Sequence, residues 1–184
     1  MVKKILISLS ILCVGLIILI TLQPGTFSVQ RSAIIVAPAA TVFAQVNDLA
    51  AWNTWSPWKN LDPNPKSTLS TPSAGKGATF TWAGNNKIGE GSLTILDSKP
   101  DELVEIEQMF IRPFPGKARI TFSFSPVDSG TQVTWKMDGT NNFAGKAMCL
   151  VMDMDAMLGK DFAQGLANIK TVVEKSRIAP AAAQ

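Results

Sequence analysis

Apolar and polar residues alternate along several short stretches in the middle of the chain. Between residues 117 and 124, polar side chains separate Ala118, Ile120, Phe122 and Phe124. A period of two is typical of a strand with one buried and one solvated face. Residues 78–82, 93–95, 104–110 and 132–138 repeat the pattern. We therefore predict an antiparallel sheet with one apolar face.

Two further strands and two short helices complete the predicted sheet layer. Residues 27–36 form the first strand, and Pro38 suits the start of a short amphipathic helix. A second helix within residues 49–58 is limited to one or two turns by Pro57. Residues 66–70 form a short edge strand, which brings the predicted sheet to seven strands.

A long helix is predicted over residues 146–175, where apolar side chains return at helical spacing. They are Met148, Val151, Met152, Leu158, Phe162, Leu166, Ile169 and Val173. An apolar sheet face must be covered, and this helix is the long element available for it. The expected fold class is α+β, with a curved seven-stranded sheet wrapped around the C-terminal helix. Such packing leaves a hollow that suits a ligand.

Residues 5–22 contain neither charge nor proline. As a helix they span about 27 Å, close to the thickness of the bilayer hydrocarbon. A cleaved signal peptide is the competing interpretation, but its apolar core is usually about 7–15 residues long and precedes a small-x-small site that is missing here. We predict an uncleaved anchor over residues 1–26, a domain over 27–176 and a flexible tail over 177–184.

The charges set the orientation and exclude one class of partner. Lys3 and Lys4 precede the apolar segment and Arg31 is the next charge after it, so the N-terminus is expected inside. Those two lysines belong to 17 basic residues, which leaves 15 against 14 acidic ones. A nearly neutral domain lacks the clustered basic face that nucleic acid requires.

The chain has no histidine and no tyrosine. Ser-His-Asp and Cys-His catalytic arrangements and histidine metal sites are therefore excluded. An acid or base would have to be Asp, Glu or Lys with a shifted pKa. We predict no catalytic residue, no cofactor and no metal centre.

Several segments together resemble the SRPBCC superfamily, which contains polyketide cyclase/dehydrase-like, START-like and birch-pollen-allergen-like domains. The most distinctive is Trp-Asn-Thr-Trp-Ser-Pro-Trp at residues 52–58. The others are residues 35–43, 46–48, 75–82, 152–155 and 159–162. The resemblance is closest to membrane-anchored bacterial members and covers residues 27–174. It implies the helix-grip fold and binding or conversion of sterols, lipids, polyketides or plant hormones, but it transfers no catalytic motif.

The leading functional hypothesis is a membrane-tethered domain that holds a small hydrophobic ligand without transforming it. The expected location is the bacterial inner membrane, with a single pass through residues 5–22 and the domain on the periplasmic or extracellular side. No protein partner can be named. The expected cavity lining is Trp52, Trp55, Trp58, Phe80, Trp82, Gln108, Phe110, Phe122, Trp135, Met137, Met148, Met152 and Asp155.

Two of these positions are polar on otherwise apolar faces. Gln108 must bond to a backbone group or water, or orient the polar end of a ligand. Asp155 lies on the predicted buried stripe and needs a partner such as Arg119 or Lys136, or a polar pocket. Because the residues between the anchor and the first strand are few, we also expect Trp52, Trp55 and Trp58 near a cavity opening beside the bilayer.

Three alternatives stay open. A cyclase/dehydrase-type enzyme would use Asp155 or Glu107 as base and Arg112 or Arg119 as electrostatic stabiliser, and it needs a cavity carboxylate with a raised pKa. A non-binding envelope scaffold would have a solid core. A cuprous-ion site could use Cys149, Met148 and Met152 on one helix face.

Overall fold

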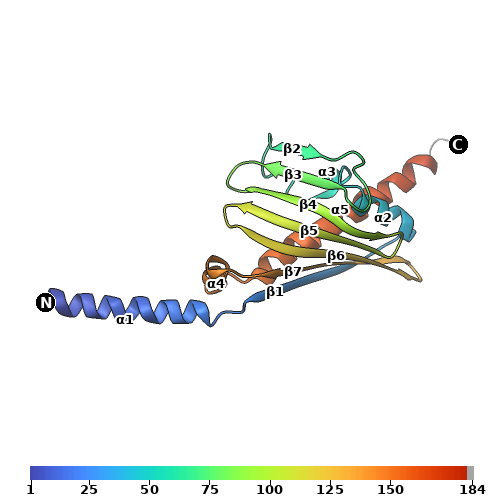
Figure 1. Ribbon diagram of the computed structural model, residues 1–184. Coiled ribbons are helices and arrows are strands. Elements are labelled where there is room, and N and C mark those ends of the chain that lie inside the picture. Colours follow the sequence, from blue (N-terminus) through green and yellow to red (C-terminus); the bar gives the residue numbers. More distant parts are fainter. Residues whose placement is uncertain (182–184) are drawn as a thin grey trace.

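The computed structural model describes the backbone of residues 1–181 and the side chains of residues 1–176. A slender N-terminal helix stands away from a domain in which a curved sheet grips a long helix (Figure 1). In chain order the elements are α1 (Val2–Thr21), β1 (Thr26–Ile35), α2 (Ala39–Asn47), α3 (Trp52–Trp55), β2 (Lys66–Leu69), β3 (Thr79–Ala83), β4 (Glu90–Lys99), β5 (Leu103–Arg112), β6 (Gly116–Val127), β7 (Gly130–Thr140), α4 (Phe143–Cys149) and α5 (Met154–Ala181).

The strands form one sheet in the order β1-β7-β6-β5-β4-β3-β2. All neighbouring pairs are antiparallel, and the register places Trp135 of β7 between Arg31 of β1 and Phe122 of β6. The predicted α+β class, the seven antiparallel strands and the two short helices after the first strand are confirmed.

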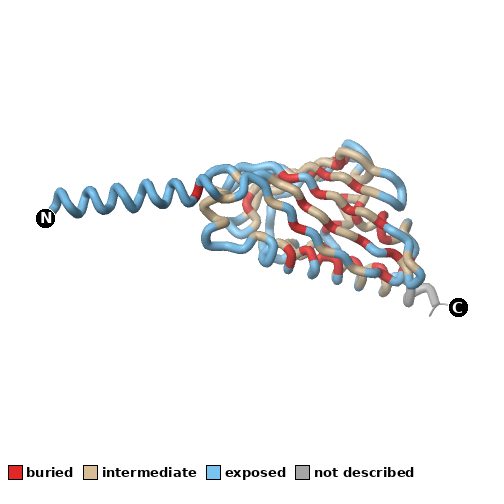
Figure 2. Tube along the Cα trace, turned by 90° about the horizontal axis from the view of Figure 1, so that it is seen from below, coloured by how far each residue is buried: buried red, intermediate tan, exposed pale blue. Residues whose placement is uncertain are grey.

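The alternation along each strand separates a buried concave face from a solvated convex one. Ala118, Ile120, Phe122 and Phe124 of β6 are all buried on the concave side. The convex side carries ion pairs between neighbouring strands, such as Arg119 with Glu105. Figure 2 shows the resulting alternation along the strands, where buried positions alternate with intermediate or exposed ones.

Helix α5 covers the β1 and β7 side of the concave face. Phe162 stacks on Trp135 with ring centroids 4.3 Å apart and an interplanar angle of 8°. Leu166, Ile169 and Val173 follow on the same buried stripe. Gly165 permits this approach, because a Cβ there would lie 2.6 Å from the Trp135 ring.

The predicted single helix over residues 146–175 is wrong, because the chain breaks between α4 and α5. Val151 is 82% exposed and Met152 is 40% exposed, so neither belongs to the buried stripe. Asp153 explains the restart: its side chain accepts a hydrogen bond from the backbone N–H of Ala156 at 3.0 Å, as a helix N-cap does. The apolar residues keep helical spacing across the break, so their pattern alone did not indicate that the first helix ends before Asp153.

The two ends of the chain bear on the predicted domain bounds. Helix α1 is long and apolar enough to cross a membrane, a property that signal sequences share. Its residues are exposed except near its C-terminal end, where Ile20 is buried. At the other end the predicted tail overlaps α5, whose backbone continues to Ala181, and residues 182–184 lie outside the described residues.

The helix break gives a matched pair of stability tests. Leu166→Ala removes a side chain that is 1% exposed on α5, and we expect it to lower the free energy of unfolding by about 2–5 kcal/mol. Val151→Ala changes an exposed residue between the helices and is expected to stay within about 0.5 kcal/mol. Denaturant unfolding of both variants in mild detergent measures the difference. Equal losses would contradict the break.

Candidate functional site

A cavity of about 290 Å³ lies over the concave face of β3 to β7. The segment after α3, the β3–β4 hairpin and the first turns of α5 close it. Its walls are mainly apolar and aromatic, which is typical of small-molecule sites. The lining residues are Trp52, Asn53, Ser56, Trp58, Lys59, Asp62, Pro65, Ser67, Phe80, Trp82, Lys87, Ile88, Leu93, Gln108, Phe110, Ile120, Met137 and Leu158.

The wall formed by β3 is built from two stacked rings. Phe80 and Trp82 both point to the concave face, and their centroids are 6.1 Å apart. Trp82 also donates from Nε1 to the carbonyl of Ile88 at 3.0 Å, which fixes its ring against the β3–β4 hairpin. On the neighbouring strand Gly91 makes room for the ring, because a Cβ there would lie 2.6 Å from it.

Helix α3 and the segment after it are fastened to α5 by one hydrogen bond each. Trp58 Nε1 donates to the Asp161 carboxylate at 3.0 Å. Asn168 Nδ2 donates to the Trp55 carbonyl at 2.8 Å. These bonds fix the position of the Trp58 ring, which lines the cavity.

Gln108 is the polar group inside the apolar wall. It lies between Ile106 and Phe110 on the concave face of β5, and its Oε1 is buried without a hydrogen-bond partner among the described residues. A buried polar atom without a hydrogen-bond partner lowers the free energy of unfolding by about 1–3 kcal/mol. A ligand that offers a hydrogen bond to the Gln108 amide would remove that cost.

Charged residues of the lining are confined to the opening. Lys59 and Lys87 are exposed, and Lys59 Nζ donates to the carbonyl of Thr54 at 2.7 Å. Both carboxylate oxygens of Asp62 accept backbone N–H groups, from Asn64 at 3.0 Å and from Asn85 at 2.7 Å. Asp62 therefore shapes the loop at the opening, and each of its carboxylate oxygens already accepts a backbone hydrogen bond.

The structure gathers part of the predicted lining. The predicted residues that do line the cavity are Trp52, Trp58, Phe80, Trp82, Gln108, Phe110 and Met137. Trp52 is 7% exposed and forms an inner wall, with Nε1 bonded to the carbonyl of Val46.

Three predicted lining residues belong to the core instead. Trp55, Phe122 and Trp135 are fully buried away from the cavity. Trp55 donates from Nε1 to the Gln45 carbonyl at 2.9 Å and packs edge-on against Trp135 at 5.8 Å. The expectation that all three tryptophans of residues 52–58 lie at the opening is therefore wrong, because α3 ends at Trp55 and only Trp58 follows it into the segment over the cavity.

Met148 and Met152 lie outside the cavity because of the helix break. Met148 belongs to α4, and Met152 follows its end in an exposed turn. The cuprous-ion hypothesis required Cys149 and both methionines on one helix face, and α4 ends at Cys149. The arrangement it needed is not formed.

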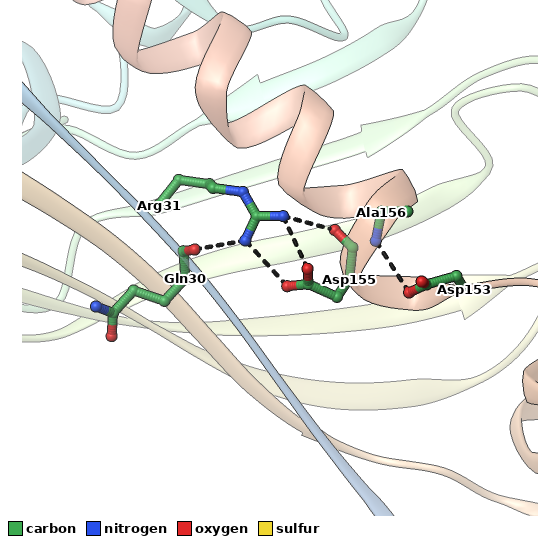
Figure 3. A network of polar contacts seen from close by, with 5 residues as sticks. All are labelled: Gln30, Arg31, Asp153, Asp155 and Ala156. Carbon is green, nitrogen blue, oxygen red and sulfur yellow. Dashed lines mark hydrogen bonds and ion pairs between the residues drawn. The ribbon is translucent and has the colours of Figure 1, made fainter.

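Asp155 is also outside the cavity, in an ion pair with Arg31 (Figure 3). The two carboxylate oxygens accept from the guanidinium at 2.9 and 3.0 Å. This bonding lowers the pKa of Asp155 and raises the pKa of Arg31. Arg31 points inward from β1 over Gly159, where a Cβ would overlap the guanidinium.

The partners expected for Asp155 are engaged elsewhere. Arg119 bonds to Glu105 at 2.9 Å. Lys136 pairs with Asp138 at 2.8 Å and lowers the pKa of that carboxylate. Both pairs lie on the convex face, on the other side of the sheet from α5.

The groups named for the enzyme alternative do not meet in the cavity. Glu107 pairs with Lys117, and Arg112 pairs with Glu90 at 2.7 Å. The lining described above contains neither these residues nor Arg119 nor Asp155. The lowered pKa of Asp155 is opposite to the raised value that this chemistry needs.

Sequence reasoning missed several wall residues. Leu93 and Ile120 lie in the predicted strands, so their inward positions could have been included. Lys59, Asp62 and Lys87 come from loops, where no periodicity indicates which side chains face the cavity.

A seven-stranded sheet gripping a C-terminal helix around an apolar cavity defines a helix-grip domain. Residues 26–174 match the family model described as polyketide cyclase/dehydrase and lipid transport. The chain therefore belongs to this family, as the sequence resemblance indicated.

Solved structures share the fold at low identity. An aromatase/cyclase from a Streptomyces species is 15% identical with a TM-score of 0.59, over 82% of this chain and 94% of the other. The di-domain aromatase/cyclase StfQ of the steffimycin pathway is 9% identical with a TM-score of 0.61, over 83% and 52%. A protein from Chromobacterium violaceum is 17% identical with a TM-score of 0.55, over 82% and 98%. No curated protein is significantly similar.

The Arg31–Asp155 pair generates a pH prediction. Because the folded pKa of Asp155 is lowered, its stabilisation is present above the unfolded value of about 3.9 and is lost as pH falls through the folded value. We expect the wild type to be more stable than Asp155→Asn near neutral pH, with the gap closing below about pH 4. Denaturant unfolding across this range measures the gap. Asp128→Asn, on an exposed turn, is the control, and an undiminished gap in acid would contradict the ion-pair assignment.

Proposed function

We propose that this chain is a membrane-tethered binding protein for a small, mainly apolar ligand that carries one polar group. The ligand would occupy the cavity of about 290 Å³, with its apolar part against the rings of Trp58, Phe80 and Trp82. Burial of apolar surface supplies roughly 25 cal/mol per Å² before the costs of association. The family description, which includes lipid transport, supports this ligand class.

The observation that carries the proposal is the unpartnered Gln108 amide oxygen, Oε1, within an apolar wall. A cavity meant to stay empty gains nothing from a buried polar atom without a partner. A hydroxyl, protonated carboxyl or amide N–H group on the ligand could donate a hydrogen bond to this oxygen. The same pairing would fix which end of the ligand enters first.

The tether rests on α1 and its short connection to the domain. Helix α1 ends at Thr21 and β1 begins at Thr26, so four residues join them. Such a linker reaches at most about 14 Å. With Lys3 and Lys4 inside, the domain would lie on the external face of the cytoplasmic membrane of a bacterium, close to lipid.

Binding without chemistry is favoured over cyclisation. Asp62 is the carboxylate of the described cavity lining, and both its oxygens accept backbone N–H groups. A general base needs a free carboxylate facing the substrate. The aromatase/cyclase structures share the fold at low identity, and that likeness alone carries no catalytic residue over to this chain.

Native mass spectrometry of the full chain, extracted from bacterial membranes in detergent, tests the proposal. We expect a bound small molecule that survives release from the micelle. Leu158→Trp, which fills the cavity from α5, should lose it, whereas Ser129→Trp on the distant β6–β7 turn should keep it. A wild-type chain that is always empty and also fails to bind added fatty acids and sterols would refute the binding function.

Gln108→Leu gives a test with two opposite readouts. Removing the buried, unpartnered amide oxygen should raise the stability of the empty chain by about 1–3 kcal/mol. The same change should lower the affinity for the captured ligand, because the ligand's polar group would lose its hydrogen-bond partner. Thermal unfolding and ligand titration measure the two effects, with Thr121→Val on the convex face as the control. A variant that is less stable and binds normally would contradict the assigned role.

A further inference from the structure

Five large apolar side chains are exposed where α1 joins the domain. We call them the apolar rim: Phe114 (51% exposed), Phe143 (54%), Leu150 (37%), Val151 (82%) and Met152 (40%). Phe114 comes from the β5–β6 turn, and the others come from α4 and the turn after it. Large apolar side chains gathered in exposed positions at one end of a domain often mark an interaction surface.

Three hydrogen bonds hold the rim around the end of α1. Lys146 Nζ donates to the carbonyl of Thr21 at 3.1 Å, and Asn141 Nδ2 donates to the carbonyl of Pro24 at 3.1 Å. Asn142 Nδ2 donates to the carbonyl of Pro115 at 3.0 Å and ties α4 to the β5–β6 turn. Figure 1 shows α4 beside the point where α1 leads into β1.

The composition of the rim suits a lipid interface. Between residues 143 and 152 the single charge is Lys146, whose long stem lets its ammonium group stay at the headgroup level while apolar neighbours enter the lipid. The turns at the other end of the sheet differ sharply. They expose Asp101, Glu102, Asp128 and Ser129.

We infer that the apolar rim inserts into the external surface of the bilayer that holds α1. This inference rests on the proposed tether, which brings the rim to the membrane through a four-residue linker. Rim insertion gives the domain one fixed orientation instead of free rotation about the linker.

The orientation also positions the cavity. Phe110 lies near the end of β5, which continues into the turn that carries Phe114. Met137 lies near the end of β7, which continues into α4. The cavity is therefore in the half of the domain that faces the rim, and docking would hold it next to the lipid.

Lipid quenching in the full chain tests the inference. In a Cys13→Ser, Cys149→Ser background, an environment-sensitive fluorophore is placed on one cysteine at a time. Leu9→Cys reports on the middle of α1, Val151→Cys on the rim and Ser129→Cys on the opposite end. The chains are reconstituted into phosphatidylcholine vesicles with a quencher on the upper acyl chain.

We expect the fluorophores at residues 9 and 151 to be quenched several-fold more than the one at residue 129. Quenching at 9 with equal, weak signals at 151 and 129 would overturn rim insertion and leave the tether intact. The same weak signal at residue 151 is expected if the rim binds a protein instead of lipid. No quenching at 9 would overturn the tether itself, and the inference with it.

Discussion

The contact of α5 with Trp135 is the interaction on which the rest of the domain depends. One indole in the middle of β7 meets Phe162 of α5, Trp52 and Trp55 of α3, Trp58 of the following segment and Phe122 of β6. Its Nε1 is buried without a partner among the described residues, a cost of about 1–3 kcal/mol that this aromatic packing must offset. Because the helix is fixed on the β1–β7 side, it does not cover the concave face of β3 to β5. The segment after α3 and the β3–β4 hairpin lie over that part of the sheet, and the cavity forms there.

The fold could be predicted from the sequence because strand alternation is a local signal. Each inward residue of β6 could be named in advance, and turns at glycine and proline separated the strands. The break before α5 could not be found by the same reasoning, because Met148, Val151 and Met152 continue the helical spacing of Phe162 and Leu166. Asp153 was the available signal, since an acidic residue ahead of an apolar run often caps a new helix.

The candidate site was less predictable because a cavity is a property of packing in three dimensions. An aromatic residue on the inward face can fill the core or border a hollow, and pattern alone did not separate Trp55 from Trp58. Asp155 shows the same limit, since its partner Arg31 lies 124 residues away in β1. An arginine on the inward side of a strand, between Val29 and Ala33, was a usable sign that a carboxylate had to reach it.

The short edge strand β2 determines how constant the cavity size can be. Its residues are all exposed, and four residue pairs join it to β3. Opening so small a ladder costs much less than unfolding the core, so we expect this side of the wall to open without global unfolding. Since Ser67 of β2 and Pro65 just before this strand border the cavity, the volume of about 290 Å³ is that of the closed wall. Displacement of β2 would admit ligands bulkier than that volume while the Trp135 packing stays in place.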